Sequence, residues 1–168
     1  KQVIIYVEGD ILTKLPHTGI NLPSTLDRSY GINKEYDLQS YKDVNQVTVY
    51  YIGKYNDETY YVPVTKYLND DREKIKIIVD ELASSKLYTT NLMSYLNSNT
   101  KLLATEQEVD SLFLTFNSYI FNDMNERNIL EEVIYTISLS VGDNYDVREV
   151  VFNVEDQEIY KSVIKTIE

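Results

Sequence analysis

The sequence predicts an α+β fold: a two-layer sandwich with two helices on one face of a small mixed β-sheet. Two observations predict it. Apolar residues alternate in paired runs that read as hairpins, and segments with a helical period follow these pairs. The predicted order is β-β-α-β-β-α-β, which favours helices packed against a sheet. A length of 168 residues with 43% hydrophobic residues is enough for one folded domain and an extra segment.

The first hairpin lies in VTVYYIGKYNDETYYVPVTKYL, residues 47–68. Two runs rich in valine and tyrosine flank the polar turn at residues 56–58, which is a hairpin signal. Pro63 lacks an amide proton and cannot donate to a β-ladder. The second run is therefore expected to form an edge strand or to carry a bulge.

Two helices are predicted from apolar residues at i, i+3, i+4 and i+7. In residues 69–85, Asp70 and Glu73 precede the apolar stripe and fit a capping box at the start of the helix. In residues 123–142 Asp123 and Glu126 repeat that pattern, and Gly142 is expected to end the helix. The two stripes consist of Ile75, Ile78, Val79 and Leu82, and of Leu130, Val133, Ile134, Ile137 and Val141.

The remaining strands are predicted from alternation. Residues 100–118 form a second hairpin that turns near residues 108–110, with one face made by Leu112, Leu114 and Phe116. Residues 147–156 form the final strand, with an inward face made by Val150, Phe152 and Val154. Residues 12–46 contain Pro, Gly and many polar residues, which predict an extended connector.

Charge and residue types exclude several functions. The net charge of −11 repels nucleic acid and anionic lipid, so neither is expected as a partner. Cysteine is absent, and His17 is the only histidine, which leaves no triad and no thiolate or two-histidine metal site. The oxygen ligands in residues 143–149 lack the EF-hand spacing. We therefore expect no enzyme activity, no metal and no cofactor.

Tyrosine is the most informative residue type, with sixteen copies. The first hairpin carries five of them: Tyr50, Tyr51, Tyr55, Tyr60 and Tyr61. Exposed tyrosines offer a large contact area at low entropic cost, so they can mark a protein-protein surface. Aromatic residues also favour strands for packing reasons alone, and the sequence leaves both interpretations open.

The opening run VIIYVEGDIL, from Val3, resembles the closing strand at an offset of 147 residues (154 − 7), which places Val7 on Val154. If this run once completed the sheet of a neighbouring domain, it has lost its strand partners here and is expected to pair with another edge. Val3, Ile4, Ile5 and Val7 are therefore candidates for self-association.

The chain also resembles the GerMN domain family. The resemblance rests on residues 47–68, on NTKLLATEQEVDSLFLTFNSYIF at residues 99–121, and on VIYTISLSVGDNYDVREVVFNVEDQE at residues 133–158. It implies an extracytoplasmic domain of a bacterial envelope lipoprotein, anchored to the membrane by a lipid upstream of this sequence. It also implies a non-enzymatic role in sporulation or germination, through assembly with envelope or sporulation proteins like that of ring-building domains.

The resemblance further implies a division of the chain. Residues 1–11 would be the last strand of a truncated first copy, residues 12–46 a connector, residues 47–162 a complete GerMN domain and residues 163–168 a tail. A small-ligand or cell-wall-glycan binding domain, with tyrosines as stacking platforms, is the alternative function.

Overall fold

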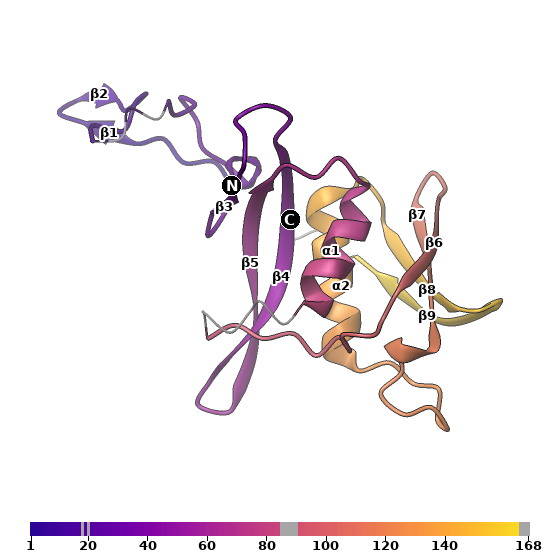
Figure 1. Cartoon of the computed structure of the whole chain (residues 1–168). Coiled ribbons are helices and arrows are strands. Elements are labelled where there is room, and N and C mark those ends of the chain that lie inside the picture. The colour runs from indigo at the N-terminus through magenta and orange to yellow at the C-terminus, as the bar shows by residue number, and fades with distance from the viewer. Residues whose placement is uncertain (18, 20, 85–90, 165–168) are drawn as a thin grey trace.

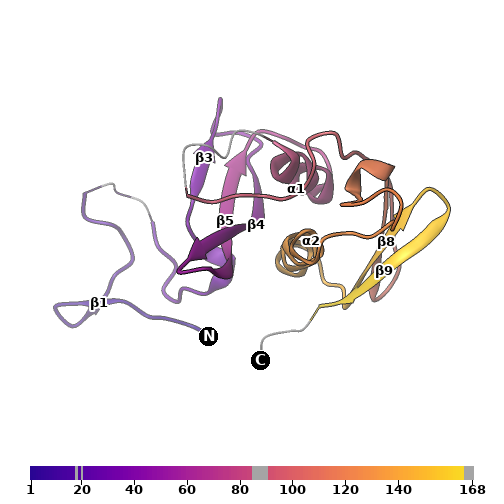
Figure 2. The same cartoon turned by 90° about the horizontal axis from the view of Figure 1, so that it is seen from below.

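A computed structural model describes residues 1–17, 19, 21–84 and 91–164 (Figure 1). Its strands form three sheets with the orders β1-β2, β3-β5-β4 and β6-β7-β8-β9. The α+β class is confirmed, with two α-helices and two mixed sheets in the described residues. The strands do not form one sheet as expected, however. Figure 2 shows both helices between the three-stranded and the four-stranded sheet.

The three-stranded sheet is built on the predicted first hairpin, β4 (Asn45–Tyr55) and β5 (Glu58–Leu68). Asn56 and Asp57 both adopt positive φ angles, which gives the tight turn that this hairpin requires. A strand that the sequence analysis missed, β3 (Glu35–Asp37), pairs in parallel with the end of β5.

The expectation that β5 is an edge strand is therefore wrong, because β5 lies between β3 and β4, and its continuous register with β4 shows no bulge at Pro63. Pro63 lies before the residues that pair with β3. Thr65, two residues further on, points its amide away from β4 and donates to the carbonyl of Ile32 at 2.8 Å. Pro63 has the same orientation, so its missing amide proton falls on the side away from β4. The pairing of Tyr50 with Pro63 thus loses no ladder hydrogen bond.

The four-stranded sheet contains the predicted second hairpin, β6 (Leu102–Gln107) and β7 (Ser111–Phe116), followed by β8 (Glu149–Val154). The faces predicted to point inward are buried. A missed strand, β9 (Gln157–Val163), completes the sheet by pairing with β8. Ile164 still donates to the carbonyl of Arg148, so the expected tail does not begin at residue 163; residues 165–168 lie outside the described part.

The helices α1 (Lys74–Ala83) and α2 (Glu131–Asn144) bury the predicted stripes in one core shared with both sheets. Their predicted caps are wrong. The carboxylate of Asp70 is bound by Arg72, and the α1 amide of Ile75 is instead bound by the hydroxyl of Tyr145 at 2.9 Å. Asp123 caps a separate turn through the amides of residues 125 and 126. α2 begins after Leu130 and continues two residues past Gly142.

The outer edge of β4 is covered by polar side chains of α2 rather than by another strand. Asn144 accepts from the amide of Thr48 at 3.1 Å and donates to its carbonyl at 2.7 Å. Ser140 accepts from the amide of Tyr50 at 2.9 Å. Further along, Ile52 and Met93 exchange two backbone hydrogen bonds. These contacts satisfy the backbone at an edge that the helices bury.

Residues 12–46, expected to be an extended connector, lie partly against the domain. A 3₁₀ helix (Arg28–Tyr30) precedes β3, and the carboxylate of Asp27 caps its start. The backbone of Ile32 exchanges hydrogen bonds with Thr65, and Asn33 donates to the carbonyl of Pro63 at 2.8 Å. Gly31 has a φ of 94°, and a Cβ there would come within 2.9 Å of Thr65. This close approach requires glycine.

The opening residues form a small hairpin, β1 (Tyr6–Val7) and β2 (Asp10–Ile11), beside the three-stranded sheet in Figure 1. Glu8 and Gly9 supply its turn with positive φ angles. The amide of Leu12 extends this pairing by donating to the carbonyl of Ile5, and Val3 exchanges two backbone hydrogen bonds with Leu26 in an isolated bridge. The apolar side chains of this hairpin are exposed.

Candidate functional site

The structure divides the five tyrosines predicted to mark an interaction surface. Tyr50 and Tyr51 are buried, Tyr61 is half-buried, and only Tyr55 and Tyr60 are exposed, by 71% and 47%. Alternation alone would have exposed either Tyr50 or Tyr51, since neighbouring residues on a strand face opposite ways. Both are buried because β4 is covered on both faces. The first two tyrosines are therefore wrong as surface residues.

Tyr50 joins the preceding segment to α2. Its hydroxyl donates to Oδ2 of Asp143 at 2.9 Å, and the guanidinium of Arg28 bonds to that hydroxyl and, at 3.1 Å, to the same carboxylate. Burial, followed by the hydrogen bond to Asp143, raises the pKa of Tyr50 to about 12. Asp143, considered above as a calcium ligand, is occupied in holding residues 27–30 against the sheet.

Tyr51 belongs to a second network on the core side. Lys66 on β5 forms ion pairs with Glu81 of α1 at 2.7 Å and Glu35 of β3 at 3.1 Å. The hydroxyl of Tyr51 donates to Glu81 at 3.4 Å, and burial raises the pKa of Tyr51. Burial alone would lower the pKa of Lys66, but Tyr51 and the two carboxylates raise it overall. The network joins three elements and leaves no unpaired base among its members.

The exposed tyrosines gather at the β4–β5 turn together with a residue that the sequence analysis missed. Tyr61 packs against Tyr135 of α2, with ring centroids 5.6 Å apart. Tyr60 lies across Gly53, where a Cβ would come within 2.4 Å of its ring. Tyr135 follows the buried residues Val133 and Ile134 on α2 but lies outside their stripe. The sequence signal that could have identified it is an aromatic residue on the exposed face of a predicted helix.

We name this region the tip surface: Tyr55, Tyr60, Tyr61 and Tyr135, with the carboxylates of Asp57, Glu58, Glu131 and Glu132. Burial and then the nearby charges of Glu132 and Glu131 raise the pKa of Tyr61. A hydrogen bond to Glu131 raises the pKa of Tyr135. Lys54 lies beside these groups, with its ammonium 5.4 Å from the ring centroid of Tyr95. Counting only residues that the structure describes, the four carboxylates and Lys54 give this surface a local charge of −3.

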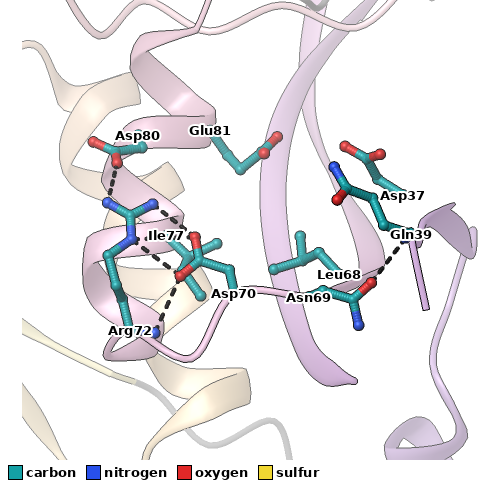
Figure 3. A pocket seen from close by; sticks show the side chains of 9 residues that line it. All are labelled: Asp37, Gln39, Leu68, Asn69, Asp70, Arg72, Ile77, Asp80 and Glu81. Atoms are coloured by element: carbon teal, nitrogen blue, oxygen red, sulfur yellow. Dashed lines mark hydrogen bonds and ion pairs between the residues drawn. The ribbon is translucent and has the colours of Figure 1, made fainter. Parts of the chain in front are cut away.

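A cleft of about 220 Å³ lies between α1, the end of β5 and the segment after β3 (Figure 3). Arg72 lies on the α1 side of the cleft and bonds Asp70 at 2.7 Å and Asp80 at 2.7 Å (Figure 3). The hydrogen bond from Arg72 lowers the pKa of Asp70, so this carboxylate is held ionised and is unsuited to act as a general acid. Four carboxylates, those of Asp37, Asp70, Asp80 and Glu81, line the cleft with the single guanidinium of Arg72, so the cleft is acidic.

Asn69, at the rim of this cleft, fixes the loop at residues 39–43. Its Oδ1 accepts from the amides of Gln39 and Ser40 at 2.8 and 3.0 Å, and its Nδ2 donates to the carbonyls of Ser40 and Lys42. With a longer bond from Nδ2 to the carbonyl of Asp43 at 3.4 Å, five hydrogen bonds join this one side chain to the backbone of the loop.

No described residues form a group of three or more His, Cys, Asp or Glu side chains that would hold a metal ion. Asn144 of the 143–149 segment is bonded to Thr48, and Glu149 lies 3.4 Å from Lys161. Within the described part of the chain, no helix is long and apolar enough to cross a membrane.

Comparison with known proteins identifies the class to which this fold belongs. The model of the Germane family, described as sporulation and spore germination, matches residues 48–160. The match runs from within β4 into β9, so it covers both helices and all strands of the two mixed sheets except β3, the start of β4 and the end of β9. The chain belongs to the Germane family.

A similar protein and a similar solved structure, both named GerM, narrow the comparison within the family. The spore germination protein GerM of Bacillus subtilis (strain 168) is 30% identical over 154 residues, which is 89% of this chain and 42% of that protein. The solved structure of the tandem GerMN domains of the sporulation protein GerM from Bacillus subtilis aligns with a TM-score of 0.76 at 29% identity, over 92% of this chain and 54% of that one. This chain is similar to GerM. It spans about half the length of the solved tandem domains and less than half the length of the GerM protein. Both names describe sporulation or germination and not a chemical reaction.

Proposed function

We propose that this chain is a non-enzymatic protein-interaction module that acts outside the cytoplasm in sporulation or germination, in a protein held at the membrane by a lipid anchor. Membership of the Germane family supports the process. In the cleft beside α1, Arg72 binds the carboxylates of Asp70 and Asp80, which supports an interaction role over catalysis there. The partners are envelope or sporulation proteins.

The tip surface is the observation that carries the interaction role. Tyrosine is enriched in interfaces because its rigid ring buries a large area and its hydroxyl tolerates water. Two elements from distant parts of the sequence, β4–β5 and α2, bring these rings together at one end of the sheet. Tyr55 has no packing role that explains its exposed position at the turn, and the tip's charge of −3 favours a partner with a basic, apolar patch.

The proposal is tested in a spore-forming host that lacks its own Germane-family protein and is supplied with the full-length protein carrying Tyr55→Ala and Tyr135→Ala. Tyr60 is left in place because it covers Gly53. We expect fewer heat-resistant spores at unchanged protein level. Tyr119→Ala, which removes an exposed tyrosine after β7, is the matched control and should behave as wild type. A double variant that sporulates normally would overturn the role of the tip surface.

We further propose that the opening hairpin is the end of a preceding GerMN copy. The turn of β1–β2 begins at Glu8 with φ 52°, and the turn of β8–β9 begins at Glu155 with φ 56°, so the offset of 147 residues (155 − 8) holds for the turn as well as the sequence. The tandem domains of GerM support this division. In the isolated chain, we propose that the strand from Val3 to Val7 pairs with a second molecule.

A further inference from the structure

We propose that the loop after β3 forms a binding site for a neutral glycan, with Tyr36 and Tyr41 as platforms for the sugar rings. The site lies at the end of the three-stranded sheet opposite the β4–β5 turn, as the position of β3 in Figure 1 shows. It is independent of the tip surface and of the protein-interaction role.

The aromatic platform is exposed and fixed. Tyr36 stacks on Tyr67 with ring centroids 4.8 Å apart and an interplanar angle of 13°, yet it remains 61% exposed. Tyr67 is itself held by a hydrogen bond from its hydroxyl to the carbonyl of Tyr30 at 3.1 Å. Tyr41 is 95% exposed, so it contributes nothing to the core. Two flat aromatic rings that remain exposed to solvent and lie outside the core indicate a ligand-binding role.

The space beside these rings is of saccharide size and has polar walls. A cleft of about 570 Å³ is lined by Tyr36, Leu38, Gln39, Ser40 and Tyr41. A neighbouring cleft of about 590 Å³ continues past Ser40 to Lys42, Asp43 and Asp71. Aromatic faces accept the apolar face of a pyranose ring, and the amide and hydroxyl side chains are matched to its hydroxyl groups. Two adjoining clefts suit a chain of rings.

The loop is already arranged before binding. Asn69 directs all five of its hydrogen bonds to the backbone of residues 39–43, and the hydroxyl of Ser40 accepts from the amide of Lys42 at 3.1 Å. A fixed loop loses little entropy when a ligand binds. Asn69 is thus a positioning residue and is not free to contact the sugar.

Charge sets the class of glycan. Asp43 and Asp71 border the second cleft with Lys42, and the chain as a whole carries −11. An anionic polymer would be repelled by this field, whereas an uncharged chain of hexoses or N-acetylhexosamines would not.

The test is a titration of the full chain with two neutral probes, chitotetraose and cellotetraose, followed by isothermal calorimetry and by NMR shifts of the amides of residues 39–41. We expect saturable binding of at least one probe, with shifts confined to this loop. Tyr41→Ala should weaken binding at least about tenfold. Because that side chain is almost fully exposed, its loss leaves the fold intact.

Two further variants decide the outcome. Tyr36→Phe keeps the stacked ring and should retain binding. Tyr119→Ala removes an exposed tyrosine that lies outside both this site and the tip surface, and should bind as wild type. Absence of saturable shifts with both probes, or equal binding by Tyr41→Ala and wild type, would overturn the proposal. Neither result bears on the tip surface, whose test is sporulation.

Discussion

The side-chain oxygen of Ser140 on α2 accepts a hydrogen bond from the backbone amide of Tyr50 on β4 at 2.9 Å, and its proton goes to the carbonyl of Thr136 at 2.6 Å. A helix thereby does at this edge what a neighbouring strand would otherwise do. The arrangement explains how the hairpin β4–β5 can be buried on its long edge without joining the four-stranded sheet.

Ser140→Ala should lower the free energy of unfolding by about 1–3 kcal/mol, because it leaves a buried amide without its partner. Ser138, two residues before Ser140 on α2, provides a matched control. Its hydroxyl is buried and has no hydrogen-bond partner among the described residues, so Ser138→Ala should be neutral or stabilising. Denaturant unfolding measures both. Equal losses for the two variants would contradict a special role for Ser140.

Arg28→Ala should loosen residues 27–34 from the sheet, since it removes both bonds to the Tyr50 and Asp143 cluster. Hydrogen exchange of the Ile32 amide should become faster, while global stability falls by no more than about 1 kcal/mol, as expected for a half-exposed ion pair. Arg148→Ala removes a more exposed pair with Asp110 and should change neither measurement. Unchanged exchange in Arg28→Ala would show that β3 and the Ile32–Thr65 bonds suffice to hold this segment.

Stability should fall at alkaline pH because of Tyr50. Its pKa is raised to about 12 in the folded state, whereas tyrosine in an unfolded chain ionises near pH 10. Between these values the folded state binds more protons, so the free energy of unfolding decreases as pH rises, by up to about 1.4 kcal/mol per pH unit for this group. The contribution is fully present below pH 10. Urea unfolding at pH 9, 10 and 11 should show a shallower pH slope for Tyr50→Phe than for wild type or Tyr55→Phe.

The parts of the fold that sequence reasoning predicted are those set by local pattern. Alternation and the polar turn define β4–β5, and the i, i+3, i+4 spacing defines the buried faces of α1 and α2. β3 was missed because only its parallel pairing with Lys66 to Leu68 makes it a strand, and β9 because its exposed edge carries few apolar residues.

The site was predicted less well, for the same reason. The abundance of tyrosine in the first hairpin pointed to the end of the sheet where Tyr55 and Tyr60 are exposed. Burial of Tyr50 and Tyr51, however, depends on α2 and residues 27–34, which are distant in sequence. The caps failed because Asp70 has a nearer partner in Arg72. A local motif states what a side chain can bond, and the tertiary fold decides which partner it meets.

Phe116→Ala should lower the free energy of unfolding by about 3 kcal/mol or more, the cost of emptying a buried aromatic site. Phe116 is fully buried on the core side of β7, and its ring stacks on Phe152 of β8 at 6.2 Å. Phe113→Ala, on the opposite face of the same strand, is the control and should cost less because that residue is only half-buried. A loss below about 1 kcal/mol for Phe116→Ala would show that the core does not depend on this position.

Self-association through the opening hairpin is the last outcome to test. Val3, Ile4, Ile5 and Val7 are exposed on a strand whose ladder is short, and exposed apolar strands pair with other edges. We expect light scattering to show a concentration-dependent dimer for the chain, and Ile5→Lys with Val7→Lys to shift it to the monomer because two cations oppose the pairing. Val109→Lys adds a charge at the exposed β6–β7 turn and should leave the dimer unchanged. A chain that stays monomeric at every concentration, with random-coil exchange rates from Ile4 to Val7, would contradict this pairing.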